Sequence, residues 1–112
     1  MLDLSRLQEA FEDDAAGIAD LLEMALETGR KHRAALEEGL AAGDASVVAR
    51  AAHGIKGSAG TIGATAVYAL AMELDARART GDLDGARERI DAIGDAYARV
   101  AEEVRAYRAS LP

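Results

Sequence analysis

Apolar residues recur three and four positions apart along most of the chain, which is the spacing of one face of an α-helix. The series is most regular toward the C-terminal end, where it continues over about four heptads. There it comprises Leu83, Ala86, Ile90, Ile93, Tyr97, Val100, Val104, Tyr107 and Leu111. This pattern predicts a long bundle helix. The chain length favours burying its seam in a core within one molecule, so we expect a monomer.

Three earlier segments show the same periodicity. One runs from Asp13 or Asp14 to about Ala42, one contains His53, and one follows a glycine-rich break at residues 60–63. Their core-facing positions include Ile18, Leu22, Ala25, Leu36, Leu40, Val48, Ala51, Ile55, Ala59, Ile62, Val67, Leu74 and Ala78. The basic residues 30–33 are expected to form a solvated turn midway along the first segment.

Glycine and aspartate separate these segments. Gly43-Asp44 and Gly81-Asp82 each place a glycine, which can end a helix in the left-handed conformation, before an aspartate that can cap the next helix. A short apolar series over residues 3 to about 11 predicts an additional helix that must dock on something larger. The prediction is an all-α fold: an antiparallel four-helix bundle with a short additional N-terminal helix, forming a single domain over residues 1–112.

The composition agrees with a helical bundle. Half of the 112 residues are apolar, only four are aromatic, and the one proline stands at the end of the chain. The net charge of −7 argues against nonspecific nucleic-acid binding and against anionic membranes. The absence of cysteine excludes disulfides and cysteine-based metal sites. Without a long apolar run or the basic region of a secretory signal, the expected compartment is the cytoplasm.

The second segment carries a histidine on its outer face. On a helical wheel centred on Ile55, His53 lies roughly 160° from the middle of the buried stripe. The residues around His53 are small, with a positive side chain on either flank: Ala49, Gly57 and Gly60, and then Arg50 and Lys56. Glycine inside a helix costs about 1 kcal/mol relative to alanine, so Gly57, one turn after His53, indicates a need for open space.

The stretch around this histidine resembles a known signature. It reads His53-Gly54-Ile55-Lys56-Gly57-Ser58, which is similar to the His-x-x-Lys-Gly-Ser signature of histidine-containing phosphotransfer (HPt) domains, and the resemblance covers nearly the whole chain. It implies a phosphocarrier that accepts a phosphoryl group on His53 from the receiver-domain aspartate of a hybrid histidine kinase or response regulator, and returns it to another receiver. It also implies that Mg²⁺ belongs to the partner's receiver domain and that this chain holds no cofactor.

The chemistry of such a transfer suggests roles for nearby residues. An unprotonated imidazole nitrogen can attack the phosphorus of an acyl phosphate when an acceptor holds the other nitrogen as N–H. Asp75 is the candidate acceptor, because it follows His53 by 22 positions, where many HPt domains carry glutamate or glutamine; Glu73 is a second candidate. Transfer also needs positive charge near the phosphoryl oxygens, which Lys56 and Arg50 are expected to supply.

Partner docking is expected on the open face around His53. The small residues Ala49, Gly57 and Gly60 would form that face together with apolar groups of the N-terminal helix such as Leu7. The contact should be modest and transient, since a relay requires release. The other histidine, His32, stands in a basic stretch without small neighbours and is expected to be a surface residue.

Two other classes of function stay open at this point. A helical adaptor would keep the docking face but carry no phosphate. A helical enzyme would use His53 as a general base and would need a deep apolar cavity beside it. A metal site is not expected, because no His-x-x-x-His or Glu-x-x-His pair surrounds His53.

Overall fold

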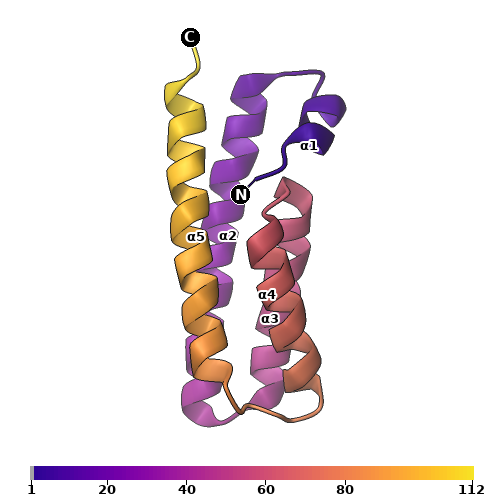
Figure 1. Ribbon diagram of the computed structural model, residues 1–112, viewed down its shortest axis with the longest axis vertical. Helices are drawn as coiled ribbons and strands as arrows, with labels where there is room; N and C mark the ends of the chain where they lie inside the picture. The colour runs from indigo at the N-terminus through magenta and orange to yellow at the C-terminus, as the bar shows by residue number, and fades with distance from the viewer. Residues whose placement is uncertain (1) are drawn as a thin grey trace.

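The computed structural model describes residues 2–112, which form five α-helices. They are α1 (Ser5–Ala10), α2 (Ala15–Ala42), α3 (Ala45–Ile62), α4 (Thr65–Arg79) and α5 (Ala86–Ala109). Helices α2 to α5 form an antiparallel bundle, and within the described range the only extended pairing is an isolated bridge between Leu2 and Ala64 (Figure 1). The predicted all-α bundle with a short additional N-terminal helix is confirmed.

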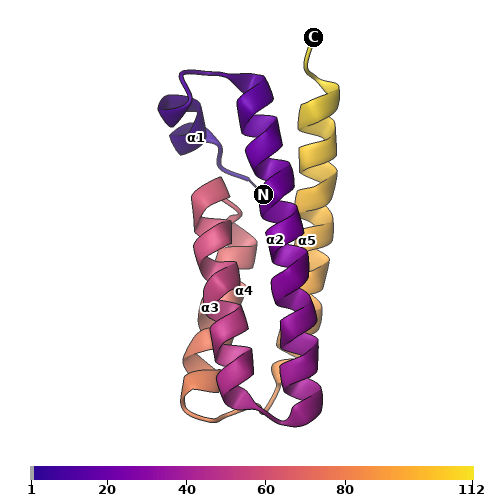
Figure 2. The same cartoon turned by 180° about the vertical axis from the view of Figure 1, so that it is seen from behind.

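The four bundle helices differ in length. Helices α2 and α5 run side by side along the whole molecule, while α3 and α4 pack against one part of them (Figures 1 and 2). This gives an elongated shape with extents of 47 × 21 × 18 Å. None of the helices within residues 2–112 is long and apolar enough to cross a membrane.

The N-terminal segment is tied to the end of α3. The Asp3 amide donates to the carbonyl oxygen of Gly63 over 2.8 Å. Gly63 has a φ of 70°, and a Cβ atom at this position would lie 1.9 Å from the Asp3 carbonyl oxygen. Glycine is therefore required here for both the backbone conformation and the close approach. The contact holds α1 beside the ends of α3 and α4.

The core lies along the inner faces of all five helices. All of its largest fully buried side chains stand at positions predicted from the helical periodicity: Ile18, Leu22, Leu36, Ile55, Ile62, Leu74, Ile93, Val48 and Val67. The apolar seam of α5 is buried from Ala86 to Val104, within the bundle. The predicted core faces of the four helices are confirmed, since burial repeats at the spacing of the apolar residues.

Two of the predicted helix boundaries hold and a third does not. Asp14 and Asp44 accept hydrogen bonds of 3.2 Å from the amides of Gly17 and Val47 and so cap α2 and α3. The prediction for Asp82 is wrong, because α5 begins only at Ala86, after Gly85. Asp82 instead accepts from the Asp84 amide over 2.9 Å. Its side chain stabilises the connection between helices and is not used to cap α5.

The basic residues 30–33 form one turn within α2, and only part of it is solvated as predicted: Arg30 and Lys31 are exposed, whereas His32 and Arg33 are half-buried. Helix α2 continues through it without interruption, because good helix formers on both sides carry the helix past Gly29. A Cβ atom at Gly29 would lie 2.5 Å from the ring of Tyr97, so this glycine admits the tyrosine of α5. The guanidinium of Arg33 lies over the same ring, 5.5 Å from its centroid. The basic stretch is therefore partly used in packing α2 against α5.

Candidate functional site

His53 stands on the outer face of α3, and its side chain is 61% exposed. One turn earlier is Ala49, and one turn later is Gly57, where a Cβ atom would meet no other atom within 4 Å. The helical wheel places the imidazole outward in the same way, since its angular position depends only on the helix period. The ring is open to a second molecule.

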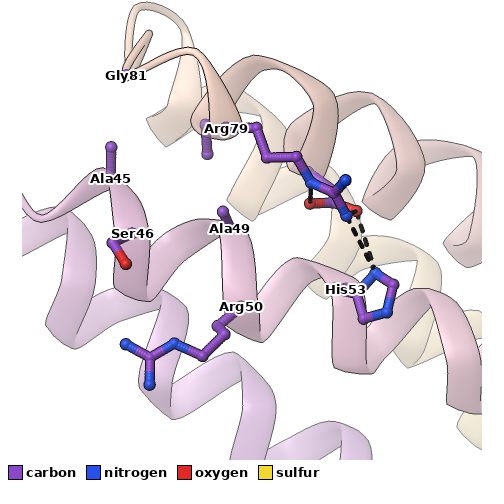
Figure 3. A pocket seen from close by; sticks show the side chains of 9 residues that line it. Ala45, Ser46, Ala49, Arg50, His53, Arg79 and Gly81 are labelled. Carbon is purple, nitrogen blue, oxygen red and sulfur yellow. Dashed lines mark hydrogen bonds and ion pairs between the residues drawn. The ribbon is translucent and has the colours of Figure 1, made fainter.

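Helix α4 brings a carboxylate to one edge of this ring. The turn at Gly63 and Ala64 reverses the chain, so that Asp75 of α4 faces His53 of α3. The distance between Nδ1 of His53 and Oδ2 of Asp75 is 3.3 Å, and the Asp75 side chain is only 4% exposed. Figure 3 shows the second ring nitrogen on the side of the ring away from α4. A proton on Nδ1 would thus leave Nε2 free at the exposed edge.

Arg79, which was not among the residues predicted from the sequence, binds the same carboxylate. Its Nε and Nη2 donate to Oδ1 and Oδ2 of Asp75, each over 3.0 Å. Nη2 also lies 3.4 Å from Nδ1 of His53 (Figure 3). The signal available in the sequence was its position four residues after Asp75, where opposite charges on a helix meet. The site contains a fork-shaped cation beside the imidazole.

Lys56 completes the charged cluster. Its Nζ lies 3.7 Å from Oδ2 of Asp75, and its side chain is 26% exposed. Burial raises the pKa of the Asp75 carboxyl, but hydrogen bonds from Arg79 and His53 and the charges of Arg79 and Lys56 hold that pKa below its usual value. Asp75 is therefore an ionised carboxylate near neutral pH, able to accept from an imidazole N–H.

An open groove runs from His53 between α3 and α4. Its volume is about 520 Å³, and most of its lining is small or charged: Ala45, Ser46, Ala49, Arg50, His53, Asp75, Ala78, Arg79 and Gly81 (Figure 3). It is not the deep apolar cavity that a general-base enzyme would need. Arg50 lines the groove, but Figure 3 shows its guanidinium directed away from His53. The cation beside the ring that was expected from Arg50 is Arg79.

Comparisons with known proteins agree with this geometry. The family model described as the Hpt domain matches residues 20–103. The chain belongs to the Hpt domain family. The solved structures include a similar one, the crystal structure of histidine-containing phosphotransfer protein B (HptB) from Pseudomonas aeruginosa PAO1. It is 29% identical, with 99% of this chain and 96% of that chain covered and a TM-score of 0.89. A search of curated proteins found no match.

The family membership makes the chain a histidine phosphotransfer protein of a phosphorelay. Hpt proteins are phosphocarriers and not enzymes in the usual sense. The resemblance inferred from residues 53–58 is thereby confirmed at the level of the family. The roles of individual side chains in this Hpt domain stay predictions, since the comparisons assign none of them.

The expected docking role of Leu7 is wrong. Leu7 is 6% exposed and belongs to the core of this Hpt domain, because α1 turns its apolar face onto the bundle. Large apolar side chains are exposed elsewhere, namely Phe11, Met24, Tyr68 and Met72. Tyr68 and Met72 lie on α4 two turns and one turn before Asp75, so they extend along the same side of the helix toward the site.

Gly60 and His32 differ from expectation. A Cβ atom at Gly60 would lie 3.4 Å from the ring of Tyr68, so that ring partly covers the position that was expected to be open. A Cβ atom at Gly54 would lie 2.6 Å from the ring of His32. His32 therefore does have a small neighbour, across the contact between α2 and α3. It is half-buried there and is not a free surface residue.

Proposed function

We propose that His53 is the residue that carries the phosphoryl group. It accepts the group from the aspartyl phosphate of a receiver domain in a hybrid histidine kinase or response regulator, and passes it to another receiver. The observation that carries this proposal is an imidazole that is 61% exposed while its Nδ1 lies 3.3 Å from a buried carboxylate. On an exposed surface histidine without such a partner, nothing would favour the Nδ1–H tautomer that leaves Nε2 free to attack.

The transfer step follows from this arrangement. The lone pair on Nε2 of His53 attacks the phosphorus, an N–P bond forms, and the P–O bond to the receiver aspartate breaks. The electron pair of the broken bond leaves with the aspartate carboxylate. Nδ1 keeps its proton, so the phosphorylated ring is positively charged, and the carboxylate of Asp75 stabilises that charge. Reversal of the same step delivers the phosphoryl group to a second receiver.

Charge around the phosphoryl group would be offset by this chain and its partner together. Arg79 lies beside the imidazole and Lys56 beside the carboxylate of Asp75, and both cations are able to approach phosphoryl oxygens. We assign Mg²⁺ to the receiver domain of the partner and propose no cofactor, kinase activity or small substrate for this chain. We further propose that it acts as a monomer in the cytoplasm. Burial of the α5 seam within the bundle supports the monomer.

The docking surface is proposed to lie on α3 and α4. It consists of Ala49 and Gly57 beside His53, and of the exposed apolar side chains Tyr68 and Met72. These small and apolar groups let a receiver approach the ring closely, whereas the net charge of −7 offers no general attraction for an acidic phosphorylation site. Lys56 and Arg79, which pair with Asp75, place positive charge locally on this surface despite the negative net charge.

A transfer assay tests the proposed phosphorylation site. The full chain is incubated with phosphorylated receiver domains from the source cell, and acid-labile label on the chain is measured at short times. We expect label on the wild type and on His32→Gln, the matched control with the other histidine removed, and none on His53→Gln. Label that survives His53→Gln would overturn the assignment. Absence of label with every receiver would favour the adaptor instead.

A further inference from the structure

Three side chains approach the carboxylate of Asp75, and their distances to its oxygens differ. Within residues 2–112, its Oδ1 is bound only by Nε of Arg79, over 3.0 Å. Its Oδ2 lies 3.0 Å from Nη2 of Arg79, 3.3 Å from Nδ1 of His53 and 3.7 Å from Nζ of Lys56. The contact with the imidazole is thus longer than the contact with the guanidinium, although this imidazole is the group that Asp75 is proposed to orient.

Nη2 of Arg79 touches both partners of that contact, and this distinguishes the two tautomers of His53. With the proton on Nδ1, the ring and Nη2 both donate to Oδ2, and two nitrogens 3.4 Å apart share one acceptor. With the proton on Nε2, Nδ1 can accept directly from Nη2. Asp75 therefore favours the tautomer with a free Nε2, whereas Arg79 favours the tautomer in which Nε2 is blocked by a proton.

We propose that Arg79 is a positioning residue that restrains His53 until a phosphoryl group arrives, a proposal that rests on the proposed function. In the free protein its Nη2 competes with the imidazole for Asp75 and offers Nδ1 a hydrogen bond. When the phosphoryl group reaches Nε2, its negative charge draws Nη2 away from Oδ2 toward the phosphoryl oxygens. Asp75 Oδ2 can then accept from Nδ1–H without competition from Nη2.

The geometry allows this exchange without rebuilding the site. Nε of Arg79 can keep its hydrogen bond to Oδ1, so that only the end of the guanidinium changes partners. The Arg79 side chain is 61% exposed and has free space around it, whereas Asp75 is held at 4% exposure. A guanidinium also presents several donors in one plane, which suits a carboxylate and a phosphoryl group equally. Lys56 lies 3.7 Å from Oδ2. Its ammonium is a single compact charge, which cannot bind the carboxylate and the imidazole with two parallel donors as the guanidinium does.

The first test measures the tautomer of His53 in the unphosphorylated protein. Two-dimensional ¹⁵N NMR of the imidazole, at a pH where the ring is neutral, gives the ratio of Nδ1–H to Nε2–H forms. We expect Arg79→Gln to raise the Nδ1–H fraction relative to the wild type. Arg77→Gln is the matched control, since it removes the same charge from the same helix at a residue paired with Glu73 and Asp82. An unchanged ratio in Arg79→Gln would overturn the proposal.

The second test measures the phosphohistidine level at equilibrium with a phosphorylated receiver. Loss of a charge-assisted hydrogen bond to the phosphoryl group should lower this level about tenfold in Arg79→Gln, although Nε2 is freer. Arg79→Lys should keep the level within about twofold, because it retains a charge, but should shift the tautomer as Arg79→Gln does. Parallel loss of folding would instead lower the level in all Arg79 variants together.

The two tests separate this inference from the proposed function. If the wild type takes no label on His53, the proposed function fails, and the tautomer ratio still decides whether Arg79 restrains the ring. If His53 is labelled normally but Arg79→Gln changes neither the tautomer nor the phosphohistidine level, the proposed function stands and the role of Arg79 is refuted.

Discussion

The two sides of α3 use the same residue type for opposite purposes. On the side that meets α2, a Cβ atom at Gly54 would lie 2.6 Å from the ring of His32. On the outer side, a Cβ atom at Gly57 would meet nothing within 4 Å. Gly54 lets a neighbouring side chain come close, and Gly57 keeps a space empty. Three positions apart on one helix, the two glycines thus differ entirely in what they contact.

The two histidines differ in the same way. His32 is half-buried between α2 and α3, whereas the side chain of His53 is 61% exposed. The buried side of α3 brings His32 against a helix backbone, and the open side surrounds His53 with Asp75, Lys56 and Arg79. The surroundings of each histidine therefore depend on which partners the neighbouring helix supplies, and not on the imidazole alone.

The largest expected effect is on the transfer rate, when a side chain is added at Gly57 on the outer side of α3. In Gly57→Gln the new side chain lies one turn from His53 and screens it, so the transfer rate should fall roughly 10- to 100-fold. Stability should stay equal or rise by up to about 1 kcal/mol, because glycine is a poor helix former. Stopped-time transfer assays and urea unfolding measure the two quantities. Ala98→Gln, on the exposed face of α5, is the control and should change neither.

Unchanged transfer in folded Gly57→Gln would show that the open position beside the ring is not needed. The comparison between the two sides of α3 would then lose its functional meaning, although the difference in packing would remain.

Adding a side chain at Gly54, on the side of α3 that meets α2, should lower the stability and leave the transfer rate unchanged. In Gly54→Leu the side chain meets the ring of His32, and overpacking of this kind costs about 1–3 kcal/mol. Urea unfolding measures the loss, and the same substitution in a His32→Ala background should recover much of it. The transfer rate of the folded protein should stay within about twofold. Equal stability losses in both backgrounds would mean that His32 is not the obstacle.

The smallest effect concerns the pH dependence of stability at Asp75. Its pKa is lowered in the folded protein, so its ionisation stabilises the fold above the unfolded pKa of about 3.9, and this contribution is lost as the pH falls through the lower folded value. At neutral pH, Asp75→Asn should be less stable by about 1 kcal/mol.

The stability difference between wild type and Asp75→Asn should be flat from neutral pH down to about 5 and should shrink below about 4. Urea unfolding at a series of pH values measures it. Glu73→Gln removes an exposed carboxylate from the same helix and serves as the control. A difference that stays constant at the lowest pH values would show that the charge of Asp75 does not contribute.

Much of the fold could be predicted because it depends on local periodicity. The core positions Ile18, Ile55 and Ile93 repeat at helical spacing, and Gly43 and Asp44 end one helix and cap the next. The outward direction of His53 follows from the same period. The start of α5 could not be predicted. An aspartate such as Asp82 can accept a hydrogen bond from a backbone amide either at the start of a helix or within a loop, and the local sequence does not distinguish the two.

The site was only partly predictable. Asp75 was found through a family resemblance, and the structure does bring it to His53. Arg79 was missed, and Arg50 was expected in its place, because a wheel gives the direction of a side chain from its own helix but not the reach of a flexible side chain from the next one. Leu7 was misjudged since an amphipathic helix has two faces, and only docking decides which of them is covered.

By itself the sequence determined that the chain forms amphipathic helices, that these suffice for one bundle, and that one imidazole points away from the core. The tertiary structure decided that Gly54 is closed by His32 while Gly57 is open, and that one buried carboxylate joins His53, Lys56 and Arg79. The reason is physical: helix direction and period arise from neighbours along the chain, whereas contacts between helices depend on how far each is rotated and shifted against the next.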